Sequence, residues 1–153
     1  MPSVEDAYSM TTVVVSGKII SLNYVSLWAT MAPEKRAQAK EDFLKTQPNT
    51  KSLETPIIQK VALEVSKTYK GENIIDTLII FTPRNGASCG FAWFKVGGSF
   101  IIYASPRSFY YGVFPFINIE GMEQKNTYWT NHCTRTNYYY EKEAQELTKL
   151  SQK

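Results

Sequence analysis

Residues 11–25 form a long run of β-branched and other apolar residues, TTVVVSGKIISLNYV, that is interrupted by a single glycine, Gly17. β-branched and aromatic residues favour strands, so this run predicts a first strand with a bulge or bend at Gly17. Aromatic residues make up 14% of the chain, which also favours strands. Further runs of this kind are IIQKVALEVSKTYKG (57–71), DTLIIFT (76–82), FAWFKVGGSFIIYAS (91–105), in which Gly97 and Gly98 predict a hairpin turn, and NTYWTN (126–131).

Helical patterns lie at both ends of the chain and in one insertion. Ser3 followed by Asp6 is like a capping box and predicts a short helix at the N-terminus. Pro33 and the helix-forming residues after it predict a helical insertion of about residues 32–55 between two strands. The spacing near the C-terminus predicts one helical face made of Tyr140, Ala144, Leu147 and Leu150.

Together these elements predict one domain over residues 1–153. With 153 residues, of which 43% are hydrophobic, the chain can bury a core without disulfides. Five or six strands with helices at the ends, and no regular alternation of strand and helix, predict an all-β fold, namely a small antiparallel barrel. The sequence has no run of about 18 apolar residues that could cross a membrane.

The charges give little support to a nucleic-acid partner. The 17 basic and 14 acidic residues leave a formal net charge of +3, and they are dispersed along the chain. Proteins that follow a phosphate backbone usually cluster their Lys and Arg residues. We therefore expect no nucleic-acid partner.

Motifs for catalysis are missing from the sequence. His132 is the only histidine, and its neighbour Cys133 would point to the opposite face if both lay on a strand, so the two are not expected to form a nucleophile and its base. Metal-ligand spacing such as C-x-x-C is absent, as is any phosphate-binding glycine motif. We expect no enzyme activity, no catalytic residue, no metal site and no cofactor.

The chain has two cysteines, Cys89 after a turn-rich segment and Cys133 after the last predicted strand. Two buried free thiols, which pack as small hydrophobic groups, are one interpretation. A disulfide or a redox function is the other. The residues alone leave both interpretations open.

The order of several short motifs resembles that of a netrin-like module. The motifs are TTVVVSGKIIS, a strand that ends in YKG, then IIFTPRNGASCG, then FKVGGSFIIYA, and finally CTRT before a helix. More narrowly, the chain is similar to bacterial proteins that resemble the N-terminal domain of the tissue inhibitors of metalloproteinases. The resemblance covers nearly the whole chain and implies a five-stranded OB-type antiparallel barrel with flanking helices.

The resemblance also implies structural functions for three residues. Domains of this family usually begin with C-x-C, and those two cysteines form disulfides with positions that match Cys89 and Cys133. Because the C-x-C would fall immediately upstream of Met1, we expect the native full-length protein to be extracytoplasmic, either secreted or attached to the cell envelope by a lipid anchor. In the chain as given, the two cysteines would be free or joined to each other. Arg135 would bond carbonyl groups at the end of the barrel or a carboxylate in the terminal helix.

A loop that binds a partner is the remaining site that the resemblance implies. In animal inhibitors of this family, the N-terminal cysteine chelates the zinc ion of the protease, and the matching loop lies alongside it in the active-site cleft. Met1 lacks the disulfide that would hold such an amine, so we expect no metalloprotease inhibition by this chain. The loop consists of Thr82, Pro83, Arg84, Asn85, Gly86, Ala87 and Ser88, of which Pro83, Arg84 and Asn85 are expected to be exposed.

The sequence thus favours a non-catalytic binding module with an unknown protein partner, for which a protease is a candidate. The alternative is an OB-fold domain that binds nucleic acid. In that case exposed aromatic side chains would stack on single-stranded bases. The candidates for stacking are Trp93, Phe94, Tyr103 and Trp129.

Overall fold

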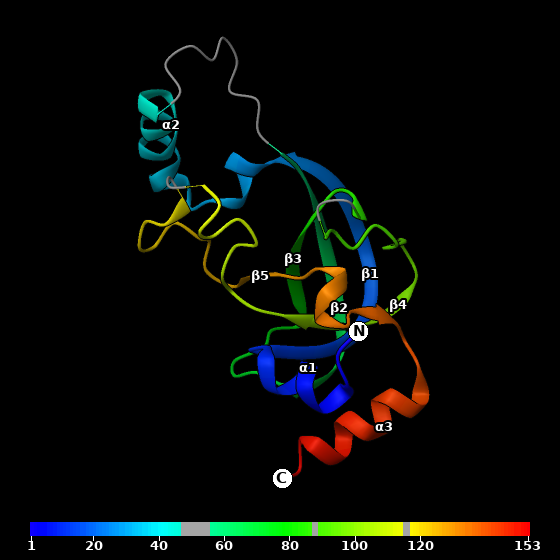
Figure 1. Ribbon diagram of the computed structural model, residues 1–153. Coiled ribbons are helices and arrows are strands. Elements are labelled where there is room, and N and C mark those ends of the chain that lie inside the picture. The colour runs from blue at the N-terminus through cyan, green and yellow to red at the C-terminus, as the bar shows by residue number, and fades with distance from the viewer. Residues whose placement is uncertain (47–55, 87–88, 115–116) are drawn as a thin grey trace.

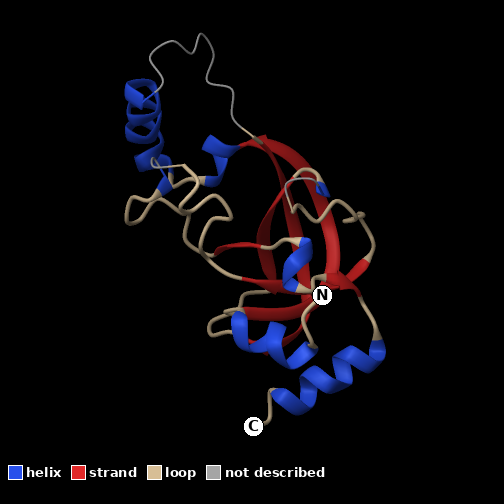
Figure 2. Cartoon of the chain, viewed as in Figure 1, coloured by secondary structure: helices blue, strands red, loops and turns tan. Residues whose placement is uncertain are grey.

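A six-stranded sheet forms the centre of the computed structural model, which describes residues 1–46, 56–86, 89–114 and 117–153 (Figure 1, Figure 2). The order of the strands in the sheet is β5-β3-β2-β1-β4-β6. The strands are β1 (Val13–Ser26), β2 (Ile57–Lys70), β3 (Thr77–Pro83), β4 (Ser99–Ala104), β5 (Thr127–Trp129) and β6 (Asn137–Tyr138). The helices are α1 (Val4–Met10), α2 (Arg36–Thr46) and α3 (Glu141–Leu150), with short 3-10 helices η1 (Leu27–Thr30), η2 (Pro33–Lys35) and η5 (His132–Thr134).

Strands β1 and β2 form the longest pairing in the sheet, and the register between them shifts at Gly17. A Cβ atom on Gly17 would lie 2.2 Å from the carbonyl oxygen of Glu64 in β2. Only a residue without a side chain allows the two backbones to approach so closely. The irregularity predicted at Gly17 is therefore confirmed.

One strand pair departs from the predicted antiparallel arrangement. β5 lies parallel to β3, with Ile79 opposite Thr127, so the sheet is mixed. It has six strands rather than five and is not a closed barrel. β4 runs antiparallel to β1 and so returns the chain towards the end at which β3 begins, and the long segment after β4 then leads into β5 in the direction of β3. The broader prediction, a mainly β fold with flanking helices, is confirmed.

One further contact joins strands that are not neighbours in this order. Two backbone hydrogen bonds, of 3.0 Å and 2.7 Å, link Ser105, just after β4, to Trp129 in β5. The end of β4 therefore approaches β5, although the two strands are not neighbours in the order of the sheet.

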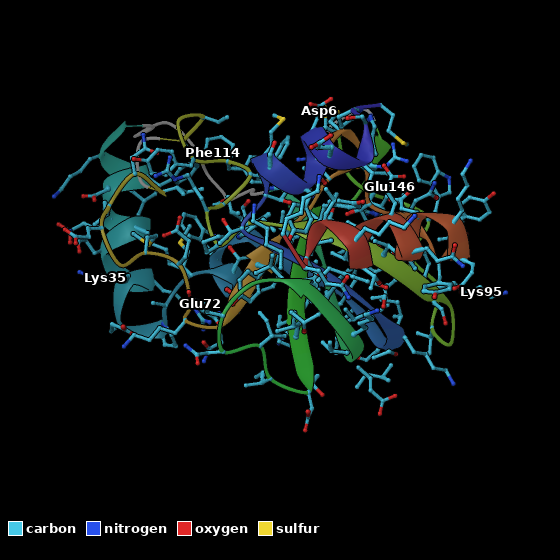
Figure 3. The ribbon with its side chains drawn as sticks, turned by 90° about the horizontal axis from the view of Figure 1, so that it is seen from below. Asp6, Lys35, Glu72, Lys95, Phe114 and Glu146 are labelled. Carbon is cyan, nitrogen blue, oxygen red and sulfur yellow. The ribbon has the colours of Figure 1, made fainter. Side chains whose placement is uncertain are left out.

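Helices α1 and α3 pack side by side at one end of the sheet, as Figure 3 shows by Asp6 on α1 and Glu146 on α3. The predicted cap of α1 is confirmed, because the Ser3 hydroxyl accepts a hydrogen bond from the Asp6 backbone N–H at 3.1 Å. In α3, Ala144 and Leu147 are buried as predicted, whereas Tyr140 is exposed and does not belong to the buried face.

Helix α2 lies at the other end of the molecule and begins after Pro33, which confirms the helical part of the predicted insertion. The rest of that insertion, residues 47–55, lies outside the described residues. None of the helices described here is long and apolar enough to cross a membrane.

The predicted hairpin at residues 91–105 is wrong in its first half. Only Ser99–Ala104 forms a strand, and the segment before it turns. Phe91 and Phe94 are buried there, with ring centroids 4.6 Å apart, and Phe94 also packs against Phe100 at 5.1 Å. These aromatic side chains pack into the hydrophobic core from a turn, and do not alternate between two faces of a strand.

Apolar side chains form three packed groups. The first lies within the curve of the sheet, the second lies beneath α2 and the segment after β4, and the third lies between the sheet and the pair α1 and α3. The members of these groups include Val15, Ile80 and Phe100 in the first, Trp28, Phe43, Phe81 and Trp129 in the second, and Ala7, Ile101, Tyr103 and Leu147 in the third.

Candidate functional site

The chain turns sharply at η5 after β5 instead of continuing as a strand. The Asn131 side chain accepts a hydrogen bond from the backbone N–H of Cys133 at 2.8 Å, and the Thr134 hydroxyl accepts one from the backbone N–H of Asn131 at 3.4 Å. Such reciprocal caps fix the start of a short helical turn. Arg135 ends the turn with a left-handed backbone, at φ 79°.

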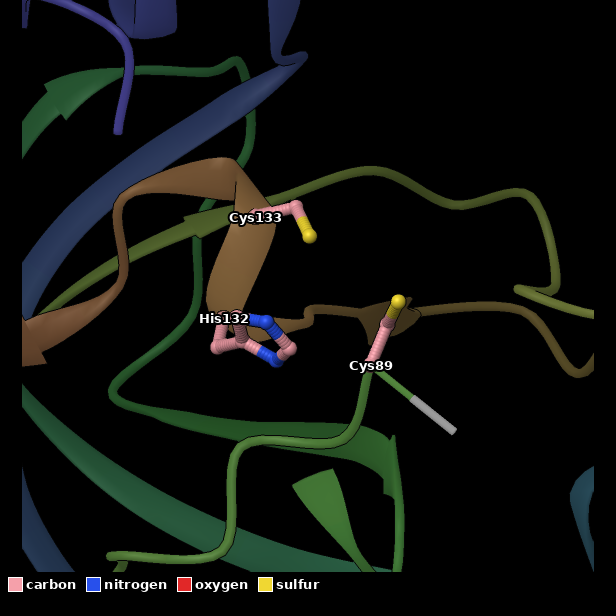
Figure 4. A group of neighbouring side chains, drawn as sticks. All are labelled: Cys89, His132 and Cys133. Carbon is pink, nitrogen blue, oxygen red and sulfur yellow. The ribbon is translucent and has the colours of Figure 1, made fainter. Parts of the chain in front are cut away.

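This turn brings His132 and Cys133 against Cys89 (Figure 4). The backbone N–H of His132 donates to the carbonyl oxygen of Cys89 at 3.1 Å, which joins the two segments directly. The sulfur atoms of Cys89 and Cys133 are 3.9 Å apart, and the candidate ligand atoms of all three residues lie within 4.8 Å of one another. The condition under which His132 and Cys133 would face opposite ways is not met, because both residues lie on a 3-10 turn and not on a strand.

The two cysteines are free thiols with different surroundings. Cys89 is half-buried and Cys133 is exposed. Desolvation by burial is the main cause that raises the pKa of Cys133. The hydrogen bond to Cys89 and the negative charge of the Cys89 sulfur when ionised raise this pKa further, while the positive amino group of Met1 lowers it. A catalytic cysteine usually has a lowered pKa, so the geometry does not describe an activated nucleophile.

Arg135 connects η5 with the N-terminus and with α3. Its guanidinium donates two hydrogen bonds to the Glu143 carboxylate, at 3.1 Å and 2.9 Å, and a third to the carbonyl oxygen of Pro2 at 2.6 Å. The Tyr103 hydroxyl donates to the same carboxylate at 2.7 Å. The Glu143 carboxylate in α3 is one of the two kinds of partner expected for Arg135, whereas the carbonyl group belongs to Pro2, ahead of α1, and not to the end of a strand.

Hydrogen bonds also hold the backbone at the start of the predicted partner-binding loop. The side-chain amide of Gln59, which is buried, donates to the carbonyl oxygens of Arg84 and Phe91, each at 3.2 Å. The backbone N–H of Gly90 donates to the Asn85 carbonyl oxygen at 2.9 Å. A Cβ atom on Gly90 would lie 1.9 Å from the carbonyl oxygen of Pro83, so the loop can close this tightly only on a glycine.

The exposure of this loop differs from the prediction. Pro83 is buried at the end of β3, and so is Thr82, whose hydroxyl accepts a hydrogen bond from the Phe91 backbone N–H at 2.9 Å. Arg84, Asn85 and Gly86 are exposed, and residues 87 and 88 (Ala87 and Ser88) lie outside the described residues. The surface available to a partner therefore begins at Arg84.

A small hollow adjoins this exposed part of the loop. It has a volume of about 260 Å³ and is lined by Pro56, Ile57, Arg84, Asn85 and Tyr110. The Arg84 guanidinium lies over the ring of Tyr24, at 5.3 Å from the centroid. Tyr24 is 59% exposed and Ile57 is 42% exposed, so large side chains of both residues remain open to solvent.

Three of the four aromatic residues proposed to stack on nucleic-acid bases are not available for it. Phe94, Tyr103 and Trp129 are buried in the core, at 7%, 0% and 4% exposure. Only Trp93, at 55%, is exposed. Base stacking needs ring faces that solvent can reach, so this arrangement gives no stacking surface built from these four residues.

A larger hollow, of about 560 Å³, lies beside the segment that joins β4 to β5. Its walls carry charges of both signs, including Arg107, Glu123 and Lys125, and none of the site residues predicted from the sequence lines it. No sequence pattern indicates this hollow, because its walls come from loop residues without a recognisable motif.

Comparison of the chain with models of known protein families finds no match, and comparison with curated protein sequences finds no significant match. The netrin-like resemblance therefore rests on the order of motifs in this sequence. Sequence reasoning considered His132 only together with its neighbour Cys133 and did not predict that it lies beside Cys89. The pattern Asn131 to Thr134, a cap and its partner three residues later, was the available indication of a turn.

Proposed function

We propose that this protein is a non-catalytic interaction module of the netrin-like type, and that it binds a protein partner through the surface formed by Tyr24, Ile57, Arg84 and Asn85. We call this surface the Arg84 edge. A protease is a candidate partner. The proposal includes an extracytoplasmic location for the native protein, which follows from the family resemblance.

An OB-type barrel is the scaffold that we propose for this module. Support comes from the order of the strands, in which β1 pairs with both β2 and β4 while β3 pairs with β5. Support also comes from the bridge between Ser105 and Trp129, which links β4 to β5 and so connects the two sides of the sheet. In OB-fold proteins a partly open five-stranded barrel presents its loops to ligands.

The observation that carries the binding proposal is the exposed arginine–tyrosine pair beside a hollow. Tyr and Arg are enriched among the residues that contribute most to protein–protein binding. Arg84 and Tyr24 are held against each other at 5.3 Å, next to the exposed Ile57. Because hydrogen bonds from Gln59 and Gly90 hold the backbone at Arg84 and Asn85, binding has less backbone freedom to remove at these two residues.

The convergence of the N-terminus with both cysteines is a second point of support. The amino group of Met1 lies close enough to Cys133 to affect its pKa, and the carbonyl oxygen of Pro2 accepts a hydrogen bond from Arg135. The family resemblance implies the same neighbourhood, since there the N-terminal segment meets positions that match Cys89 and Cys133. We propose binding to a protein partner, and not metalloprotease inhibition, as the activity of this module.

A photo-crosslinking residue placed at Asn85 tests the proposal in cells of the native host. We expect a discrete adduct at Asn85, its loss when Arg84→Ala is added, and no such adduct with the same crosslinker at the exposed Glu72, on the turn between β2 and β3. Adducts of equal yield at both positions, or adducts that Arg84→Ala leaves unchanged, would contradict the Arg84 edge. Purified adduct partners identified by mass spectrometry would then show whether a protease is among them.

Fluorescence anisotropy with a labelled single-stranded oligonucleotide tests the alternative function. Binding driven by phosphate contacts weakens steeply as salt rises. We expect no binding even at low salt, because three of the four proposed stacking residues are buried. Salt-dependent binding that is lost on Trp93→Ala would favour the nucleic-acid function instead.

A further inference from the structure

We propose that Cys89, His132 and Cys133 form a binding site for a single thiophilic metal ion, with Zn²⁺ as the reference ion. Thiolate and imidazole ligands together favour Zn²⁺ and Cu⁺ over Mg²⁺ or Ca²⁺, which prefer oxygen ligands. The site is separate from the Arg84 edge and does not depend on the proposed interaction function. It also differs from two sequence-based expectations, because it assigns a metal site where none was expected and requires reduced Cys89 and Cys133 where the family resemblance implies disulfides.

The distance between the sulfur atoms agrees with tetrahedral coordination. Zinc–sulfur bonds are about 2.3 Å long, so two thiolates at a tetrahedral angle lie about 3.8 Å apart. The sulfur atoms of Cys89 and Cys133 are 3.9 Å apart. A disulfide would need them at about 2.05 Å, so the observed spacing is closer to that of two ligands of one ion.

The histidine completes a set of three ligands. Its candidate ligand atom lies within 4.8 Å of both sulfur atoms, and Figure 4 shows the three side chains pointing towards one another. A zinc–nitrogen bond of about 2.0 Å requires nitrogen–sulfur distances of about 3.5 Å. The ligand atoms, which lie within 4.8 Å of one another, would have to move closer together to reach this spacing on binding an ion.

An unsatisfied polar atom supports the same assignment. The Nδ1 atom of His132 is buried and has no hydrogen-bond partner among the described residues. A buried polar atom without a partner costs about 1–3 kcal/mol, so a ligand at Nδ1 would remove this cost. An ion bound at Nδ1 would give this atom a partner and leave Nε2 to bond a neighbouring group or water, as the second ring nitrogen of metal-bound histidines usually does.

The backbone holds the ligands in position before any ion arrives. Cys89 has a left-handed backbone, at φ 58°, which is uncommon for a residue with a side chain. The hydrogen bond from the His132 N–H to the Cys89 carbonyl oxygen joins the two ligand-bearing segments, and the Asn131 side chain caps the turn under Cys133. Strained and capped positions of this kind tend to occur at functional sites.

The charge of the filled site also fits its surroundings. Two thiolates and one divalent cation are neutral together, which suits a half-buried position better than isolated thiolates would. Three protein ligands leave a fourth position for water or another group, as in open zinc sites. Binding displaces the two thiol protons, so the affinity should fall as the pH is lowered.

Titration of the fully reduced chain with Co²⁺ as a spectroscopic probe, followed by displacement with Zn²⁺, tests this proposal. We expect one equivalent of Co²⁺ to produce thiolate-to-cobalt charge-transfer bands and the visible spectrum of tetrahedral cobalt, and Zn²⁺ to abolish both. Cys133→Ser should roughly halve the charge-transfer intensity and weaken Zn²⁺ binding at least about 100-fold, compared with about 10–100-fold for typical outer-sphere changes. His132→Gln should keep both thiolate contributions but weaken binding.

Two matched controls keep the result interpretable. Asn137→Ala, at an exposed position of β6 near the site, should leave the titration unchanged, and circular dichroism shows whether each variant is folded. The proposal is overturned if the reduced, folded protein gives no thiolate bands, or if both ligand variants bind like the wild type. It is equally overturned if alkylation and mass measurement of protein from its native source show both cysteines in disulfides. None of these outcomes affects the crosslinking test at Asn85.

Discussion

Replacement of Arg135 by methionine should destabilise the fold markedly, although the residue lies near the surface. The Arg135→Met variant keeps the apolar stem and the same left-handed backbone but loses three hydrogen bonds, two to Glu143 and one to Pro2. The Glu143 side chain is only 11% exposed, and the Arg135 side chain 21%. The Glu143 carboxylate would therefore stay largely buried, with the Tyr103 hydroxyl as a donor but without its cation.

The size of the effect follows from this burial. Exposed ion pairs contribute about 0–1 kcal/mol, whereas loss of one member of a fully buried pair costs about 3–5 kcal/mol. The Arg135–Glu143 pair lies between these limits, so we expect a loss of about 2–3 kcal/mol in the free energy of unfolding. For a domain of this size each kcal/mol lowers Tm by about 2–4 °C, and the expected decrease is about 5–10 °C.

Urea denaturation, followed by the fluorescence of the buried Trp28 and Trp129, measures this loss. The matched control is Lys45→Met, which removes the ion pair with Glu41, where both side chains are 67% exposed, and should change stability by no measurable amount. The double variant Arg135→Met with Glu143→Gln should be more stable than the sum of the single effects predicts, because no buried charge is left unpaired. If Arg135→Met unfolds at the same urea concentration as Lys45→Met, the structural function assigned to Arg135 is wrong.

Two further predictions concern the sheet. Burial, together with the hydrogen bond to Glu143, raises the pKa of Tyr103. The protonated Tyr103 hydroxyl therefore stabilises the fold fully below the unfolded pKa of about 10, and this stabilisation is lost as the pH rises towards the folded pKa. The loss is up to about 1.4 kcal/mol per pH unit. Tyr103→Phe should be less stable at neutral pH but should lose less stability between about pH 9 and about pH 11 in urea titrations, and an unchanged alkaline slope would refute this. Gly17→Ala places a Cβ atom 2.2 Å from the Glu64 carbonyl oxygen and should cost about 1–3 kcal/mol, whereas Gly86→Ala, with no atom within 4 Å of the added Cβ, should be nearly neutral in the same assay.

Local patterns were sufficient to predict most of the regular elements. The β-branched run at 13–26, the cap at Ser3 and the apolar spacing of Ala144 and Leu147 each depend on neighbours in the sequence, and the structure confirms them. The parallel pairing of β5 with β3 could not be predicted in this way. It depends on the path of the long segment before β5, which contains no local signal for direction.

The candidate metal site shows the same limit more clearly. Cys89 is far in sequence from His132 and Cys133, and only the folding of the β3–β4 segment against η5 brings the three together. Ligand spacing such as C-x-x-C reports only sites made within one short segment. The predicted exposure of Pro83 was also wrong. A proline in a turn-rich sequence can lie at the buried end of a strand, and its burial depends on the rest of the fold and not on its neighbours in the sequence.

The position of β1 between β2 and β4 also has a consequence for how the chain folds. One edge of β1 pairs with β2, the next strand in the chain. The other edge pairs with β4, which is more distant in the sequence, so that Val13 lies opposite Ala104. Contacts between residues so distant in sequence slow folding to the millisecond-to-second range, and until they form, the run VVVSGKII presents an open strand edge to other chains. Lys18, which is exposed within that run and pairs with Ser99 in the folded sheet, places a charge on this strand, and we expect this charge to limit association of chains in which β4 has not yet paired.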